Sequence, residues 1–246
     1  MRKTIFLLAL TGMIGSVHAQ REITDPKATE QWGPVPAVVT PGKGNQPPSD
    51  AVILLGNNGD LSLWESVKDG EVPWDLEDGV LTVKPGSGAI RSRLYFGDCQ
   101  VHIEWRTPAT VEGTGQGRGN SGVFFMERYE VQVLDNYNNR TYANGQAGSV
   151  YKQHIPLVNA CRPPGEWQEY DIIWTAPRFN EDGSLKKPAF ITVFHNGILI
   201  QNHAEIRGTT AFIGEHQYNA HPERLPLMLQ DHNNPVSYRN IWIRDL

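Results

Sequence analysis

The chain has 246 residues, with 22 basic and 27 acidic side chains and a formal net charge of −5 at pH 7. A net negative charge does not attract the phosphate backbone of a nucleic acid, so we expect no nucleic-acid partner. Hydrophobic residues are 39% of the chain and charged residues 20%. These fractions exclude disorder for most of the chain, and there is no run of about 20 apolar residues to span a bilayer.

The first segment has the features of a targeting signal. Arg2 and Lys3 precede an apolar run at residues 5–14, and Val17-His18-Ala19 supplies small residues where a signal peptidase reads the chain. We therefore expect residues 1–19 to be a signal peptide that is cleaved after Ala19. The mature protein is then predicted to be periplasmic or secreted.

Residues 20–50 contain six prolines and three glycines, which prevent a regular hydrogen-bond ladder. This segment is predicted to be an extended arm. From residue 51 onward, Gly, Pro or Asn-Gly interrupts short apolar runs about every ten residues, as is typical of an all-β sandwich or barrel. No further change of composition separates a second domain, so residues 51–246 are predicted to form one β-sandwich.

Several segments of this domain alternate apolar and polar residues with the period of a strand. They lie at residues 101–106, 130–133, 170–174 and 241–244. One apolar face per segment predicts antiparallel sheets with one buried side. Asn196-Gly197, between residues 189–195 and 198–200, predicts a hairpin because both central residues of a type I′ turn need positive φ.

The chain has two cysteines, Cys99 and Cys161. In an oxidising compartment a bridge between them is allowed, but the sequence does not imply one. Neither lies in a CxxC pair or beside a histidine, which gives little support to a zinc site or a cysteine nucleophile.

The first group of candidate functional residues lies on the segment 130–133. If Val131 and Val133 face the core, Glu130 and Gln132 project from the opposite face, which we expect to be an exposed sheet surface. Curvature of the sheet would make that surface a trough. Asp135 has the wrong parity to join them unless a bulge intervenes. A solvated strand face is the alternative interpretation.

Three other polar groups could contribute. In the cluster at 230–234, Asp231 and His232 are neighbours, so they point to opposite faces of a strand and one of them is expected to serve a turn. The alternating His102, Glu104 and Arg106 fit an ion-pair ladder as well as a functional site. The loop at 145–154, which contains Tyr151, could form the rim of a site or be an ordinary surface loop.

Four segments together resemble the 3-keto-disaccharide hydrolase domain family: LSLW at 61–64, GNSGVFF at 119–125, YEVQVLD at 129–135, and residues 227–246. The resemblance covers residue 51 to the C-terminus, and VTPGK at 39–43 is similar to the lead-in of periplasmic members. It implies a concanavalin A-like jelly-roll β-sandwich of two antiparallel sheets. It also implies action on glucosides oxidised at C3 of the sugar ring.

Glucanases of this fold carry Glu-x-Asp-x-x-Glu on the nucleophile strand, where this chain has Glu130, Gln132 and Asp135. Retaining glycosidases need two carboxyl groups about 5–5.5 Å apart, so an amide in the middle argues against ordinary double displacement. A ketone at C3 opens another route because it acidifies the C2 proton. Removal of that proton lets the enolate expel the aglycone by β-elimination, and later addition of water would make the net result hydrolysis.

This route needs a base near C2, donors for the enolate oxygen and an acid near the glycosidic oxygen. We assign the proton transfers to Glu130 or His232. The expected substrate contacts are Arg118, Asn120 and Gln132 at the keto oxygen or neighbouring hydroxyls, with Glu104, Tyr151 and Arg239 in support. A divalent metal held by Glu104, Glu130, Asp231 and His232 could stabilise the same charge, but no metal-binding spacing is present and we rank it below a site without metal or other cofactor.

Two other functions compete with this one: a conventional secreted glycosidase and a non-catalytic carbohydrate-binding module. The expected ligand is a small sugar in every case. Because the chain has no GxGxxG fingerprint for a dinucleotide, a separate oxidoreductase partner would have to make a 3-keto substrate.

Overall fold

The computed structural model describes residues 24–68 and 70–246. The predicted signal peptide therefore lies outside the described residues. The described chain separates into residues 24–38 and a second unit that begins at Val39. The first unit carries one 3-10 helix, η1 (Pro26–Thr29), whose Lys27 amide donates to Asp25 Oδ1 at 3.0 Å. No helix of the described residues is long and apolar enough to cross a membrane.

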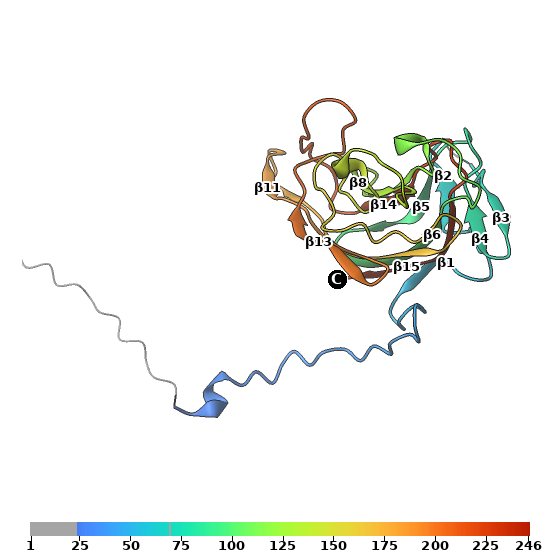
Figure 1. The fold of residues 1–246 in the computed structure, drawn as a ribbon. Coiled ribbons are helices and arrows are strands. Elements are labelled where there is room, and N and C mark those ends of the chain that lie inside the picture. The colour runs from blue at the N-terminus through green and yellow to red at the C-terminus, as the bar shows by residue number, and fades with distance from the viewer. Residues whose placement is uncertain (1–23, 69) are drawn as a thin grey trace, which may run out of the picture. The chain divides into compact units, whose positions relative to one another are not determined.

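The second unit is built on two antiparallel sheets (Figure 1). The large sheet has the order β13-β12-β9-β6-β15-β4-β3, and β1 also pairs with β15; the small sheet has the order β2-β5-β14-β7-β8. The strands of the large sheet are β1 (Val52–Leu55), β3 (Asp75–Glu77), β4 (Val80–Thr82), β6 (Cys99–Arg106), β9 (Gln168–Thr175), β12 (Phe190–His195), β13 (Ile198–Glu205) and β15 (Ser237–Asp245). Those of the small sheet are β2 (Trp64–Ser66), β5 (Ile90–Phe96), β7 (Ser121–Phe125), β8 (Tyr129–Val133) and β14 (Leu225–Leu229).

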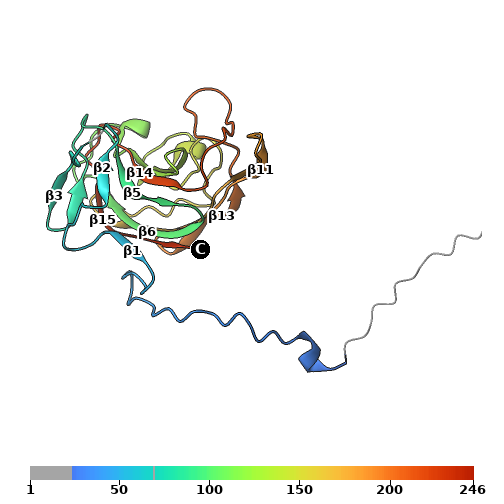
Figure 2. The same cartoon turned by 180° about the vertical axis from the view of Figure 1, so that it is seen from behind.

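A hairpin of β10 (Arg178–Phe179) and β11 (Leu185–Lys187) and two short 3-10 helices, η2 (Gly115–Gly117) and η3 (Ala143–Gly145), complete the elements. The views from the front and from behind both place β5 and β14 of the small sheet over β6 and β15 of the large sheet (Figures 1 and 2). This confirms the predicted all-β sandwich of two antiparallel sheets.

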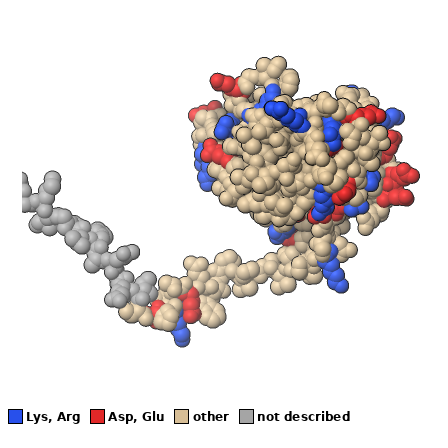
Figure 3. All heavy atoms as spheres, viewed as in Figure 1, with Lys and Arg blue, Asp and Glu red and all other residues tan. Residues whose placement is uncertain are grey.

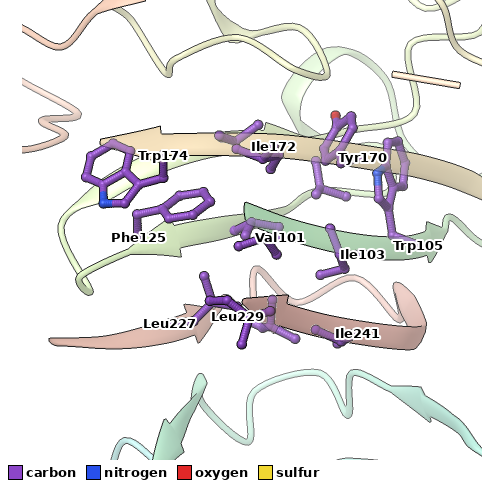
Figure 4. Close-up of a cluster of buried hydrophobic side chains, with 14 of the residues drawn as sticks. Val101, Ile103, Trp105, Phe125, Tyr170, Ile172, Trp174, Leu227, Leu229 and Ile241 are labelled. Carbon is purple, nitrogen blue, oxygen red and sulfur yellow. The ribbon is translucent and has the colours of Figure 1, made fainter. Parts of the chain in front are cut away.

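The core lies between the inner faces of the two sheets. On β6, Val101, Ile103 and Trp105 are almost fully buried and belong to one hydrophobic cluster with Trp174 of β9 and Leu227 of β14. Figure 4 shows these side chains in the core, with Trp174 and Trp105 at opposite ends and Val101 and Ile103 between them. Because side chains alternate along a strand, each core residue leaves its neighbours on an outer face.

The Asn196-Gly197 hairpin is confirmed. His195 pairs with Ile198, and the two turn residues have φ of 52° and 78°. The cysteines are both free: Cys99 is buried in β6, and Cys161 lies in a loop.

Residues 39–50, here named the strap, lie against the outer face of the large sheet. The carbonyl oxygen of Asn45 accepts hydrogen bonds from Asn240 Nδ2 at 2.9 Å and from Trp242 Nε1 at 3.2 Å. Arg244 pairs with Asp50 at 2.7 Å. The strap explains why Trp242, an outer-face residue, is only 6% exposed.

Basic and acidic side chains are mixed on the surface of the sandwich. On the face that Figure 3 shows, Lys and Arg lie scattered among Asp and Glu rather than gathered by sign. This face therefore has no single-sign field of the kind that steers charged ligands.

Candidate active site

The site is built on the outer face of the small sheet, where β7 and β8 pair. Phe124 lies opposite Glu130, and Gly122 lies opposite Gln132. The predicted parity of this segment is confirmed, since Val131 is in the core cluster and Glu130 faces outward. The expectation of an exposed surface is corrected: Glu130 is 5% exposed and Gln132 1%. Loops rise over this part of the sheet and bury it.

These loops and strands enclose a cavity of about 680 Å³. Five of the predicted site residues line it: Asn120, Glu130, Gln132, Tyr151 and His232. The remaining lining residues are Gln116, Gly117, Phe124, Tyr142, Thr210, Phe212 and Gln230. Its size falls within the range of roughly 300–1,000 Å³ typical of small-molecule sites.

Gly122 makes room for the carboxyl group on the cavity floor. A Cβ atom at this position would lie 2.7 Å from Phe124 Cε2 and 2.8 Å from Glu130 Oε1. Any larger residue would therefore push the carboxyl group from its place.

The amide of Gln132 holds the carboxyl group of Glu130 from the other side. With its nitrogen toward the neighbouring acceptors, Gln132 donates to the Ser121 carbonyl oxygen at 3.0 Å and to Glu130 Oε1 at 2.9 Å. In the opposite orientation of the amide, Gln132 Nε2 instead donates to Gln116 Oε1 at 2.9 Å. Gln116 is fixed in turn because its Nε2 donates to the Gly145 carbonyl oxygen at 2.8 Å.

Glu130 has the electrostatics of a proton-transfer group. Burial raises its pKa to about 8, because the charged form is deprived of water. It forms no ion pair with any residue in the described part of the chain. A buried carboxyl group with a strongly perturbed pKa in a cavity is a typical mark of a functional site.

A tyrosine pair forms part of the cavity wall. The hydroxyl groups of Tyr142 and Tyr151 lie 2.6 Å apart. Burial raises the pKa of Tyr151, so its hydroxyl group stays protonated and available as a donor.

Asp231 and His232 have different roles, as expected, although they lie in the loop between β14 and β15 and not in a strand. Asp231 serves a turn: its Oδ1 accepts from the Asn233 amide at 2.8 Å and its Oδ2 from the Gly88 amide at 2.9 Å. His232 is exposed and lines the cavity. A proton donor or acceptor therefore stands at the solvent side, away from the buried Glu130.

Arg118, one of the expected substrate contacts, does not line this cavity. Its Nε pairs with Asp135 Oδ2 at 2.7 Å, its Nη2 donates to the Tyr137 carbonyl oxygen at 2.9 Å, and both charged residues line a second cavity of about 260 Å³. The intervening Gly119 has φ of 57°, which breaks the strand alternation that would have aligned Arg118 with Asn120.

Glu104 and Arg239 also lie elsewhere, on β6 and β15 of the large sheet. They are cross-strand partners, with Arg239 Nε 2.6 Å from Glu104 Oε2, and His102 Nε2 lies 3.6 Å from Glu104 Oε1. Glu104 and His102 of the expected ladder are therefore in an ion-pair cluster, with Arg239 as the basic partner. Burial acts to raise the pKa of Glu104, but the nearby His102 ring and hydrogen bonds from Asn240 and Arg239 outweigh it and hold the pKa at about 2. Because Ile103 and Trp105 face the core, Glu104 must face away from the small sheet.

The four residues considered as metal ligands are not brought together. Glu130 and His232 share the cavity, Asp231 holds its turn, and Glu104 lies on the other sheet. Within residues 24–68 and 70–246, no group of three or more His, Cys, Asp or Glu side chains is arranged to hold a metal ion.

Sequence reasoning missed several lining residues. Phe124 could have been found, because it alternates with the core residue Val123 and so shares a face with Glu130 through the strand pairing. Gln116, Tyr142, Thr210 and Phe212 lie in loops or short helices, where no periodicity indicates direction. Only the folded loops reveal that they meet.

A family model described as a 3-keto-alpha-glucoside-1,2-lyase-like domain matches residues 51–244. A crystal structure of a candidate glycosyl hydrolase from Parabacteroides distasonis ATCC 8503 is 51% identical, with a TM-score of 0.86 over 90% of this chain and 97% of that chain. Another candidate glycosyl hydrolase from the same organism shares the fold at 20% identity, with a TM-score of 0.58 over 80% of this chain and 94% of that chain.

No protein with a curated description matches the sequence. The family model and the relative at 51% identity support a carbohydrate-active function. Because the family model spans most of the sequence, the chain belongs to the 3-keto-alpha-glucoside-1,2-lyase-like domain family.

Proposed function

We propose that this protein is an enzyme that cleaves 3-keto-glucosides at the glycosidic bond by β-elimination. The ketone at C3 acidifies the proton on C2, and a base removes it. The electron pair of the broken C2–H bond forms a C1=C2 double bond through the enolate, while the C1–O bond breaks and its electrons leave with the aglycone oxygen. That oxygen takes a proton, and hydration of the unsaturated sugar is a later step.

The observation that carries this proposal is the single carboxyl group in the cavity. Of the twelve described residues that line it, only Glu130 carries a carboxyl group. Double displacement requires two such groups, one as nucleophile and one as acid. An elimination requires one strong base and a separate proton donor, which this cavity provides.

We assign removal of the C2 proton to Glu130. With a pKa of about 8, Glu130 is ionised in roughly a tenth of the molecules at pH 7. The ionised form is a much stronger base than an exposed carboxylate. We assign the proton for the departing oxygen to His232, because its exposed position suits a leaving group that must escape to water. Asn120 and Tyr151 are the proposed donors to the enolate oxygen on C3.

Incubation with a 3-keto-glucoside in deuterated water, followed by NMR and mass spectrometry, tests the reaction. Elimination releases the aglycone together with a 2-hydroxy-3-keto-glycal. Direct formation of 3-keto-glucose without deuterium at C2 would instead indicate displacement, as in a conventional glycosidase. Binding without turnover would indicate a carbohydrate-binding module.

The substrate must come from another reaction. A 3-keto-glucoside is the product of oxidation at C3, so we propose that a separate oxidoreductase supplies it. The periplasmic location of this protein stays a prediction from residues 1–19. A site without a metal ion also stays a prediction, based on the lack of a metal-binding spacing in the sequence.

A further inference from the structure

The loop between β13 and β14 brings exposed apolar side chains to the mouth of the cavity. This loop is the orange segment at the top of Figure 1. Phe212 lines the cavity and yet is 68% exposed, and its neighbour Ile213 is 85% exposed. Exposed apolar side chains of this size add little to folding, so their placement beside a cavity indicates contact with a ligand.

The loop is tied to the cavity floor at its base. The Glu130 amide donates to Thr210 Oγ1 at 3.0 Å, and the Thr210 amide donates to the Arg128 carbonyl oxygen at 2.8 Å. A further backbone hydrogen bond from Thr209 to Gln217, at 2.9 Å, closes the loop on itself. The base of the loop that carries Phe212 is therefore joined to the backbone at Glu130.

Lys152 fixes the aromatic ring itself. Its ammonium group donates to the Phe212 carbonyl oxygen and lies 4.2 Å from the centre of the Phe212 ring. The same group lies 5.7 Å from the ring centres of both Tyr142 and Tyr151. Lys152 has φ of 59°, in the left-handed region that a residue with a Cβ rarely adopts.

We propose that Phe212, with Ile213 beside it, is the platform that binds the aglycone, and that the preferred substrates are 3-keto-glucosides with a flat aromatic aglycone. This inference rests on the proposed function. The sugar ring occupies the polar floor next to Glu130, and the aglycone extends past His232 to the mouth. An aromatic ring there stacks on Phe212, as aromatic pairs do in protein cores.

The chemistry of the mouth favours an aryl group over a second sugar. A sugar aglycone needs several hydrogen-bond partners, whereas Phe212 and Ile213 have none to offer in their side chains. An aryl aglycone leaves as a phenolate-like oxygen. The ammonium group of Lys152, close to the platform, favours the negative charge that develops on it.

The test compares a phenyl 3-keto-glucoside with a 3-keto-disaccharide of two glucose units. We expect Phe212→Ala to raise KM for the phenyl substrate about tenfold, which corresponds to about 1.4 kcal/mol, and to change kcat/KM for the disaccharide less than threefold. Phe212→Tyr should restore most of the loss. Tyr95→Ala, which removes another exposed aromatic residue outside the cavity, should leave both substrates unaffected.

Equal losses for both substrates, or no loss for either, would overturn the platform. Calorimetry with unoxidised phenyl glucosides of both anomers tests the platform separately from the proposed reaction, because binding requires no turnover. A wild-type protein that binds a phenyl glucoside about tenfold more tightly than Phe212→Ala supports the platform even if no 3-keto-glucoside is cleaved. Equal affinities of the two proteins contradict it.

Discussion

Two buried glutamates in this protein show how the surroundings of a carboxyl group set its pKa. Glu104 and Glu130 are both 5% exposed. Glu104 receives hydrogen bonds from Arg239 and Asn240, and its pKa falls to about 2, whereas burial alone raises the pKa of Glu130 to about 8. Glu104 is therefore a permanent anion that joins two strands, and Glu130 can exchange a proton near neutral pH.

Glu130→Gln is expected to abolish turnover and to alter the pH dependence of stability. The folded protein holds this proton more tightly than the unfolded chain, so the free energy of unfolding falls as pH rises from about 4.5 to about 8. In the wild type this fall is on the order of a few kcal/mol, whereas the glutamine of the variant does not ionise. The variant should therefore be more stable than the wild type at pH 9 and similar to it at pH 4. Thermal unfolding across pH checks this, and parallel curves would contradict it.

Gly122→Ala should damage activity far more than stability. The new methyl group meets the ends of the Phe124 and Glu130 side chains, which can swing aside, so we expect only a small change in Tm. Displacing a catalytic group by about 1 Å can lower the rate about 10²-fold, so we expect kcat to fall by about that factor. Gly33→Ala, at a position with open space around it, is the control. An unchanged kcat would show that the carboxyl group needs no such space.

At the scale of elements, strands supply the floor of the cavity and loops supply its walls. The pairing of β7 with β8 sets Phe124, Glu130 and Gln132 on one face, so their relative positions follow from register. The strap behaves like an element of the large sheet although it has no ladder of its own. Its Asn45 carbonyl oxygen receives donors from Asn240 and Trp242 of β15.

Removal of the strap should therefore destabilise the sandwich. A chain that begins at residue 51 removes the acceptor of Trp242 Nε1 and the Asp50 partner of Arg244, and it exposes one side of the Trp242 ring to water. We expect its Tm to be several degrees below that of a chain that begins at residue 20, since one buried aromatic contributes roughly 1.5–3 kcal/mol. Calorimetry of the two chains measures the difference. Equal Tm values would mean that the strap only lies on the sheet.

The whole molecule folds without a disulfide bond between its two cysteines. Cys99 and Cys161 are free, although the predicted compartment would allow a bridge. A domain of about 200 residues buries enough surface to fold without one. We expect dithiothreitol to leave Tm unchanged and thiol titration of the unfolded chain to find two free groups per molecule. A fall in Tm on reduction, of the size that a lost disulfide causes, would contradict this.

Much of this architecture could be predicted from the sequence, because strands and hairpins have local signatures. The alternation around Val131 placed Glu130 on the outer face, and Asn196-Gly197 located a turn. Three of the expected substrate contacts, Arg118, Glu104 and Arg239, do not line the cavity. Their direction depends on a positive φ at Gly119 and on which sheet each strand joins, and both are properties of the tertiary structure.

The hydrogen bond from the Glu130 amide to Thr210 Oγ1 joins the loop that carries Phe212 to the strand that carries Glu130. In the proposed mechanism, the segment that contacts the aglycone is therefore attached to the backbone of the residue that removes the proton. We expect mutations that reshape the mouth to disturb the timing and alignment of proton removal as well. Broadening the range of accepted glycosides would then come with slower chemistry unless this attachment is preserved.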